Sequence, residues 1–428
     1  PSRSHPGSFY ALAESPQLFK QLLMVSGYER YFQIVKCFRD EDLRLDRQPE
    51  FTQIDVEMSF VNEDDIFGAI EGLILRIFRE VLDIDLMQSY PEGRFPRMDF
   101  AEAMTRFGND KPDLRFGLEH TDLTDLVIEH GGGGVSFFEP IAGRFQSNTY
   151  RRDLPAEIIK ALVVPASAGM SRAEGDKLEQ FVRQMGATGL ARAKVAAGGE
   201  WTQSPLAKTV KRPFREAVNS ALRAQEGDVV CFQFGPTARV NTIMANLRVH
   251  LAKKLELIPA SGSGGHWNLT WVVNPPLFEY DDQDKRWVAA HHPFTRPHDA
   301  DLSKLESDPG TVLCHRYDLV LNGFEIGGGS IRLHDPQVQA KVFAALGIDA
   351  EQAERKFGFL LKALQFGAPP HGGIALGLDR IAMLLTETEA IRDVIAFPKT
   401  QKGNDLMVGA PDRIDPGQLA ELRIATLD

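Results

Sequence analysis

Hydrophobic and polar positions follow two different periods along this chain. From 63 to 81, apolar residues recur at intervals of three and four and fall on one face of a predicted helix: Ile66, Ile70, Leu73, Ile74, Ile77 and Phe78. An apolar run from Tyr31 to Phe38 and an alternating stretch from Phe51 to Met58 predict two strands. The residues between these strands are mostly charged, so the pattern predicts a hairpin that presents a charged loop.

Further elements follow from local signals. Ser15 is a suitable N-cap and Pro16 a suitable first helical residue, so a helix is expected there. Residues 131–134 are four glycines, which predict a turn, and short strands or turns are expected at 161–165, 186–190 and 229–234. Residues 269–278 predict a buried strand. Changes in residue pattern along the chain divide it into segments 1–110, 111–258, 259–405 and 406–428. The second segment is expected to be inserted as a separate α+β domain.

A hairpin is also expected around Asn322-Gly323, a dipeptide that favours tight turns between antiparallel strands. Asp318 and Glu325 lie on either side of it and can converge once the chain folds back. Convergent carboxylates suit Mg²⁺, which binds through one or two carboxylates together with substrate phosphates. The pattern therefore predicts a magnesium site.

Glycine-rich stretches flank two further arginines. Residues 327–329 are a triple glycine just before Arg332, whose planar guanidinium suits a carboxylate. Residues 372–385 predict a small-residue strand that runs into an amphipathic helix, with Arg380 at its start, where a phosphate can bind. Both stretches are typical of sites where a ligand approaches the backbone closely.

The adjacent imidazoles of His291 and His292 precede a rigid proline. Paired histidines can bind zinc, but the other ligands of a zinc site are not evident nearby. Hydrogen bonding is therefore the favoured role.

Composition sets the outer limits. The chain has 428 residues, of which 43% are hydrophobic and 25% charged, as in ordinary globular proteins with two or three domains. No apolar run approaches the roughly 20 residues that cross a bilayer, so no membrane partner is expected and a cytoplasmic location is predicted.

Cys37, Cys231 and Cys314 lack metal-ligand spacing and are expected to be reduced and buried. A net charge of −11 argues against indiscriminate nucleic-acid binding but leaves room for a local basic surface.

Taken together, these residues resemble the class II aminoacyl-tRNA synthetases, and among them the bacterial-type aspartyl-tRNA synthetases. The resemblance rests on residues 38–41 and 47–53, which are similar to motif 2 of that family, and on residues 372–380, which are similar to motif 3. Residues 17–20, 291–295 and 325–332 match in order and character, and residues 111–258 resemble the bacterial insertion domain. The implied fold is α+β, with an antiparallel sheet flanked by helices and an inserted α+β domain.

The resemblance implies that the chain activates L-aspartate with ATP and transfers it to the 3′ end of tRNA-Asp. Arg39 and Arg380 would be the catalytic residues, which hold the α- and γ-phosphates of ATP, and Phe51 would stack on adenine. The remaining implied nucleotide contacts are Asp40, Glu41, Gln48, Glu325, Gly377, Leu378 and Asp379.

The resemblance also implies an amino-acid pocket and a metal site. Lys20 and Arg332 would bind the side-chain carboxylate of aspartate, and the pocket would be completed by Gln17, Arg39, and His291 or His292. Asp318 and Glu325 would bind Mg²⁺ that bridges the phosphates.

Motif 1, the OB-fold that reads the anticodon and the glutamate that binds the substrate ammonium are expected before Pro1, in a longer protein that forms a homodimer. Activity is expected to depend on that segment. Whether tRNA-Asn is charged as well stays open.

Three alternatives compete with this interpretation. Asparaginyl- and lysyl-tRNA synthetases share the fold, but residues 46–50 and the insertion favour the aspartyl enzyme. An ATP-dependent amidating ligase of asparagine synthesis would lack the large insertion. A catalytically silent RNA-binding module would not need the full set of charged residues, namely Arg39, Asp318, Glu325, Arg332 and Arg380.

Overall fold

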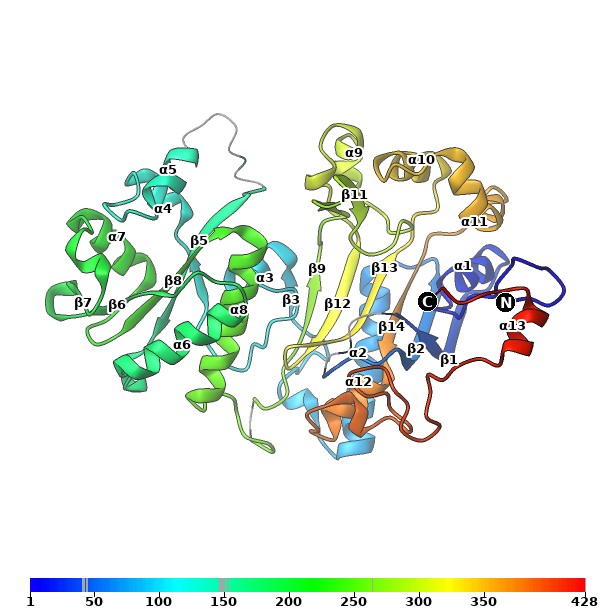
Figure 1. Cartoon of the computed structure of the whole chain (residues 1–428), viewed down its shortest axis with the longest axis horizontal. Coiled ribbons are helices and arrows are strands. Elements are labelled where there is room, and N and C mark those ends of the chain that lie inside the picture. The colour runs from blue at the N-terminus through cyan, green and yellow to red at the C-terminus, as the bar shows by residue number, and fades with distance from the viewer. Residues whose placement is uncertain (41–42, 44, 146–150, 152–153, 264, 428) are drawn as a thin grey trace. The chain divides into compact units, whose positions relative to one another are not determined.

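The computed structural model describes the chain except for residues 41–42, 44, 146–150, 152–153, 264 and 428 (Figure 1). Its contacts group into two compact units. The first comprises Pro1–Arg94, His292–Arg296 and Ile326–Asp428, and the second comprises Phe95–His291 and Pro297–Glu325. Each unit is described by itself below. The four segment boundaries expected from the sequence stay predictions.

The first unit is built on antiparallel strands in the order β1 (Arg30–Phe38), β2 (Glu50–Ser59), β14 (His371–Gly377) and β13 (Phe324–Ile331). Phe38 pairs with Glu50, so β1 and β2 are the two neighbouring strands that the sequence predicted on either side of the charged segment. Gly373 of β14 pairs with Glu57 on one side and with Ser330 on the other. This register brings three segments that are far apart in sequence onto one sheet.

Helices flank this sheet. They are α1 (Gln17–Val25), α2 (Glu63–Leu82), α10 (Pro336–Ala345), α11 (Ala350–Leu364), α12 (Leu378–Leu385) and α13 (Pro416–Leu422), with short 3₁₀ turns at Leu86–Gln88 and Ile391–Asp393. The predicted helix over 63–81 is confirmed, with Asn62 and Asp65 forming a reciprocal capping box. The first helix begins at Gln17 rather than at Pro16, and Ser15 Oγ accepts a hydrogen bond from the backbone N–H of Gln17 at 3.0 Å.

Aromatic packing fixes the short segment His292–Arg296 within the first unit. The Phe294 ring is buried and makes edge contacts with Phe343 and Phe357, at centroid distances of 6.2 and 5.1 Å. The backbone N–H of Leu333 donates to Phe294 O at 2.8 Å. Thr295 N–H donates to His292 O at 3.3 Å, which connects the neighbouring His292 to this packed segment.

The second unit contains an antiparallel five-stranded sheet in the order β4-β5-β8-β6-β7. Its strands are β4 (His120–Asp122), β5 (Glu157–Val164), β6 (Ala191–Val195), β7 (Trp201–Thr202) and β8 (Val229–Pro236). Its helices are α4 (Thr124–Glu129), α5 (Glu139–Phe145), α6 (Arg172–Gln184), α7 (Arg212–Leu222) and α8 (Thr237–Lys254). Ile159 and Ala161 face one apolar core, whereas Ile158 and Leu162 face another, so the sheet is buried on both faces.

The four consecutive glycines, 131–134, form a turn, as predicted. All four have positive φ, and a Cβ on Gly133 would lie 2.2 Å from the ring of Phe214 on α7. Lys211 N–H donates to Gly133 O at 2.8 Å. This run therefore serves close packing of the turn against a helix.

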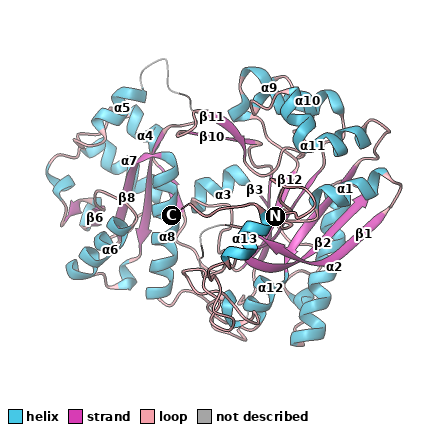
Figure 2. Ribbon diagram, turned by 45° about the vertical axis from the view of Figure 1, so that its right-hand side comes forward, coloured by secondary structure: helices cyan, strands magenta, loops and turns pink. Residues whose placement is uncertain are grey.

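The rest of the second unit includes β3 (Arg97–Asp99), α3 (Phe100–Phe107), β9 (Leu269–Val273), α9 (Lys304–Ser307) and β12 (Arg316–Leu321). It also includes β10 (Phe278–Asp281) and β11 (Arg286–Ala289), which form a two-stranded sheet of their own (Figure 2). β9 pairs with β12 antiparallel and with β3 in parallel. The prediction of one strand over 269–278 is wrong, because Asn274 has a φ of 58° and two prolines follow, which ends β9 at Val273.

The turn between β12 and β13 is the predicted one, with φ of 53° at Asn322 and 85° at Gly323. The three cysteines are buried and free, as expected. Among the described residues, no helix is both long and apolar enough to cross a membrane.

Candidate active site

A stripe of polar side chains runs along the buried face of β2. Gln53, Asp55 and Glu57 alternate with partly exposed neighbours, and the two carboxylates are fully buried. Because side chains on a strand alternate between faces, all three share one face of the sheet. Buried carboxylates are costly without partners, so this stripe calls for cations close by.

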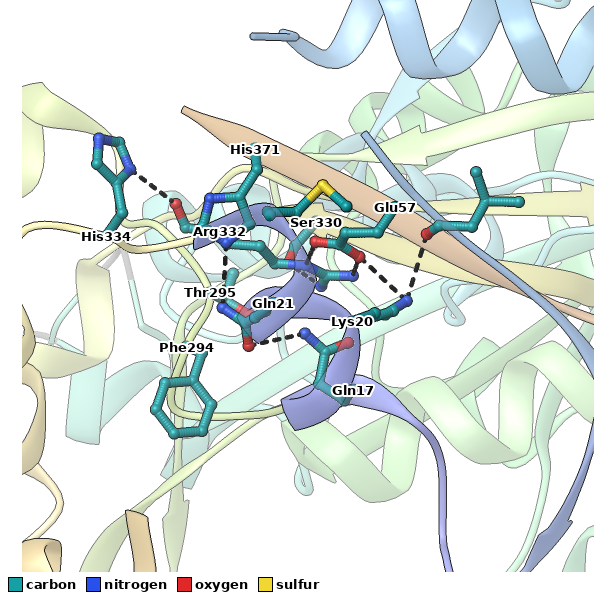
Figure 3. Close-up of polar contacts among 12 residues, drawn as sticks. Gln17, Lys20, Gln21, Glu57, Phe294, Thr295, Ser330, Arg332, His334 and His371 are labelled. Atoms are coloured by element: carbon teal, nitrogen blue, oxygen red, sulfur yellow. Dashed lines mark hydrogen bonds and ion pairs between the residues drawn. The ribbon is translucent and has the colours of Figure 1, made fainter. Parts of the chain in front are cut away.

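Lys20 on α1 supplies one of them. Its side chain is 1% exposed, and Nζ lies 2.6 Å from Asp55 Oδ1 and 3.1 Å from Glu57 Oε2. Figure 3 draws the contact with Glu57. Nζ also donates to the backbone carbonyl of Val56 at 3.3 Å. Lys20 therefore bridges the two carboxylates of the stripe.

Arg332, just after β13, supplies the other. Its Nε and Nη2 donate to the two oxygens of Glu57 at 2.9 and 3.0 Å, a bidentate pair with both side chains buried. Burial alone would raise the pKa of Glu57, but the charges of Arg332 and Lys20 hold that pKa down at about 2. Glu57 is therefore ionised, and it orients the guanidinium of Arg332.

Gly373 makes room for this arrangement. A Cβ at this position would lie 2.1 Å from Glu57 Oε2 and 2.1 Å from Val56 O. No real Cβ tolerates such contacts, so a side chain here would displace Glu57. The glycine in β14 is thus required by a carboxylate on the neighbouring strand.

The third guanidinium nitrogen of Arg332 points away from Glu57. Nη1 donates to Ser330 Oγ at 2.7 Å and lies 3.0 Å from His292 Nε2. The backbone N–H of Phe294 lies 3.2 Å from His292 Nδ1. Arg332 Nη1 is therefore an N–H donor beside the His292 imidazole, and a donor of this kind suits an acceptor such as a carboxylate oxygen.

A chain of neutral hydrogen bonds begins on the same face of α1 as Lys20. Gln17 Nε2 donates to Gln21 Oε1 at 3.0 Å, and Gln21 Nε2 lies 3.4 Å from His371 Nε2 (Figure 3). His371 Nδ1 lies 2.8 Å from Pro369 O. Burial lowers the pKa of His371, so the imidazole is neutral.

The loop between β1 and β2 is held more loosely. Arg39 is exposed, and its guanidinium carbon lies 5.1 Å from the centre of the Phe51 ring, a cation–π contact. Asp40 is exposed as well, whereas Glu41 lies outside the described residues. The side-chain amide of Gln48 bonds both to the carbonyl (3.1 Å) and to the N–H (2.7 Å) of Lys399.

The step from β14 into α12 holds the other predicted nucleotide contacts, Gly377, Leu378, Asp379 and Arg380. Asp379 Oδ2 accepts from the backbone N–H of Thr52 at 2.6 Å, and partial burial raises the pKa of this carboxyl. Arg380 Nη2 donates to Asp46 O at 3.1 Å and lies 3.3 Å from its carboxylate. Asp379 thus ties the start of α12 to β2.

In the second unit, Asp318 and Glu325 are electrostatic neighbours. Burial raises the pKa of Asp318 well above its usual range; the Arg316 charge opposes this rise and the Glu325 charge adds to it. Arg316 Nη2 lies 2.8 Å from Asp318 Oδ1. Mutual repulsion of two carboxylates is what a bound cation relieves, so this oxygen donor set fits Mg²⁺. Among the described residues, no group of three or more His, Cys, Asp or Glu side chains has the geometry of a metal site.

The structure gathers four predicted pocket residues, Gln17, Lys20, His292 and Arg332, in one connected region of the first unit, which also holds Arg39 and Arg380. His291 belongs to the second unit and is exposed. Sequence reasoning placed Gly373 in a glycine stretch close to a ligand and Asp55 and Glu57 in a charged active-site pattern. It assigned no individual role to the residues that hold the pocket together: Gln21, Asp55, Glu57, Ser330, His371 and Gly373. The signal for two of them was present, since Asp55 and Glu57 sit at alternate positions of a strand.

A model of the tRNA synthetases class II (D, K and N) matches residues 1–401. The chain belongs to this family. The sequence is 63% identical over 425 residues to an aspartate–tRNA(Asp/Asn) ligase of Anaeromyxobacter sp. strain K, a match that covers 99% of this chain and 68% of the relative. It is 51% identical to the ligase of the same name from Geotalea uraniireducens, covering 100% and 68%. It is 47% identical to an aspartate–tRNA ligase of Ruminiclostridium cellulolyticum, covering 99% and 68%.

A solved aspartyl-tRNA synthetase from Entamoeba histolytica aligns at 17% identity with a TM-score of 0.40, covering 91% of this chain and 52% of that one. The resemblance to the class II synthetases, and the antiparallel sheet flanked by helices that it implied, are both confirmed.

Proposed function

We propose that this chain activates L-aspartate with ATP to form aspartyl-adenylate and pyrophosphate, and then transfers aspartate to the 3′ end of tRNA-Asp. The observation that carries the proposal is the buried pair of cations, Lys20 and Arg332, beside the imidazole of His292. The names of the relatives at 47–63% identity support it.

The side-chain carboxylate of aspartate binds where Arg332 Nη1 offers N–H groups beside the imidazole of His292, with Lys20 close to the same guanidinium through Glu57. Asparagine carries an NH₂ group in place of one carboxylate oxygen, and this hydrogen-bond donor would face the N–H donors of the pocket. It also lacks the charge that compensates buried cations, a loss that costs several kcal/mol. Selection of aspartate over asparagine follows from these two effects.

Activation needs no nucleophile from the protein, because an oxygen of the substrate's own α-carboxylate attacks the α-phosphorus and pyrophosphate leaves. The protein has to position the reactants and neutralise charge. Arg39 serves the α-phosphate and Arg380 the γ-phosphate, with Phe51 against adenine. Gln48, Gly377, Leu378 and Asp379 line the nucleotide site, together with Asp40 and Glu41 of the loop. In the second step a ribose hydroxyl of the tRNA attacks the acyl carbon, and AMP leaves.

Mg²⁺ is the proposed metal, with Asp318 and Glu325 as its carboxylate ligands. When bound, it would offset the negative charge of the ATP phosphates. Burial raises the pKa of Asp318, and the positive charge of a bound cation would favour its ionised, metal-binding form.

The proposed partners are ATP, L-aspartate and tRNA-Asp, and the proposed setting is a cytoplasmic homodimer. Transfer to tRNA-Asn as a second acceptor is proposed as well, because two of the relatives described above are named for both tRNAs. Aminoacylation assays with each purified tRNA test this second acceptor. Charging of tRNA-Asp alone would contradict the proposal that tRNA-Asn is also a substrate.

The deciding experiment is aspartate-dependent exchange between ATP and pyrophosphate with Mg²⁺, with asparagine and lysine as controls. It is run on this chain and on a form extended at its N-terminus. Exchange with aspartate alone supports the proposal. Exchange with none of the amino acids in either form contradicts it and favours a silent RNA-binding module.

A further inference from the structure

Gln17 stands out because only one of the two polar atoms of its side-chain amide makes a hydrogen bond among the described residues. Its Nε2 donates to Gln21 Oε1, whereas Oε1 has no hydrogen-bond partner among the described residues. Gln17 is partly buried and lies one helical turn from Lys20 on the same face of α1, next to the pocket. Which end of this amide faces the pocket decides whether the pocket offers an acceptor or a donor.

The orientation of Gln17 is set from a distance. Pro369 O can only accept, so His371 Nδ1, 2.8 Å away, carries the proton of the neutral imidazole. His371 Nε2 must then accept, and it accepts from Gln21 Nε2 at 3.4 Å. Because its NH₂ group is used there, Gln21 turns its carbonyl oxygen toward Gln17 and accepts from Gln17 Nε2 at 3.0 Å.

Burial makes this chain of hydrogen bonds directional. Gln21 and His371 are both fully buried, so water does not substitute for either partner. Reversing one amide would place donor against donor and leave buried polar groups unpaired. A backbone carbonyl in the segment before β14 thereby fixes the polarity of a side chain on α1.

We propose that His371 and Gln21 are positioning residues that hold Gln17 Oε1 toward the pocket as an acceptor for the ammonium group of the amino acid. The ammonium is the one hydrogen-bond donor that aspartate offers, since its carboxylates only accept. The inference rests on the proposed function and deepens it. Lys20, Arg332 and His292 select the side-chain carboxylate of the substrate. The chain of hydrogen bonds from Pro369 O through His371 and Gln21 to Gln17, called the relay below, selects its ammonium group.

Succinate provides the test, because it is aspartate with the ammonium replaced by hydrogen. We compare the KM for aspartate, the KM for ATP and the inhibition constant of succinate in the exchange reaction. In Gln21→Met, which cuts the relay, the KM for aspartate is expected to rise about tenfold, as for the loss of one hydrogen bond to a charged group. The succinate constant and the KM for ATP are expected to stay unchanged.

Two variants sharpen the result. Gln21→Glu keeps an acceptor for Gln17 Nε2, and His371 can donate to it as an imidazolium, so its KM for aspartate should return toward the wild-type value. Gln352→Met makes the same replacement on the exposed face of α11 and should change none of the constants.

Equal increases for aspartate and succinate in Gln21→Met would reveal a merely structural role and overturn the relay, as would no increase at all. Absence of exchange in the wild-type protein would instead contradict the proposed function.

A measurement on the unaltered protein covers the case in which Gln21→Met does not fold. With ¹⁵N-labelled histidine, NMR correlation of ring nitrogens and protons assigns the tautomer of His371. A proton on Nδ1 supports the relay, and a proton on Nε2 overturns it.

Discussion

The amino-acid pocket and the nucleotide loop of the first unit are held in different ways. In the pocket, Lys20, Glu57 and Arg332 are almost completely buried and joined by ion pairs of 2.9 to 3.1 Å. In the loop, Arg39 is exposed and rests on an aromatic ring. A buried network is arranged before the substrate arrives, whereas an exposed arginine can change partners when ATP binds. We therefore propose that selectivity for the amino acid belongs to the buried, rigid region and phosphate chemistry to the exposed, adaptable one.

The largest expected effect on the rigid region comes from Glu57→Gln. This change leaves Arg332 and Lys20 with an uncompensated buried charge, and we expect the free energy of unfolding to fall by about 3–5 kcal/mol. The KM for aspartate should rise because Arg332 loses its bidentate support. Urea denaturation and exchange kinetics measure both.

The control is Glu80→Gln, which removes an exposed ion pair with Arg76 on α2. It should cost no more than about 1 kcal/mol. Equal decreases in the free energy of unfolding of the two variants would show that the buried ion pairs of Glu57 stabilise the fold no more than a surface ion pair does.

In the adaptable region, Arg39→Ala should remove about 3–4 kcal/mol of transition-state stabilisation, a loss of roughly 10²–10³ in exchange rate. The free energy of unfolding should stay near that of the unaltered protein, because Arg39 is exposed. The exchange rate reports the effect of the substitution on catalysis, and urea denaturation reports its effect on stability. Near-normal exchange would remove Arg39 from the mechanism.

Acid should weaken the rigid region specifically. The pKa of Glu57 is about 2 in the folded protein and about 4.5 in an ordinary glutamate, so its ion pairs stabilise the fold above the higher value. That contribution, a few kcal/mol, is lost as the pH falls from about 4.5 toward 2. The difference in unfolding free energy between the unaltered protein and Glu57→Gln should therefore shrink over this range. A constant difference would contradict the lowered pKa.

A smaller effect is expected for Gly373→Ala, which pushes a methyl group against Glu57 and Val56. Overpacking of this kind costs about 1–3 kcal/mol. The matched control is Gly68→Ala in α2, where a Cβ meets nothing within 4 Å and the helix should gain roughly 0.5–1 kcal/mol. Thermal unfolding distinguishes the two, and a stabilised Gly373→Ala would show that Glu57 can move freely.

Much of the fold could be predicted because its signals are local. The hydrophobic period gave α2, and Asn322-Gly323 gave the turn after β12, since both depend on neighbours in sequence. The strand expected over 269–278 failed at Asn274, where a left-handed residue before two prolines outweighed an apolar run. Helix α1 was foreseen, but one residue too early, because capping signals do not fix the first helical residue.

The sequence by itself determined the residue types at the site, with Lys20, Arg39, Arg332 and Arg380 all recognisable from their motifs, and with them the family. Only the tertiary structure decided how those residues are held. The β2–β14–β13 register brings Glu57, Gly373 and Ser330 side by side from three distant segments, and α1 lays Lys20 and Gln21 onto them. The physical reason is that a buried charge or amide is satisfied by whichever groups the fold places within about 3 Å, and no local pattern records which groups those will be.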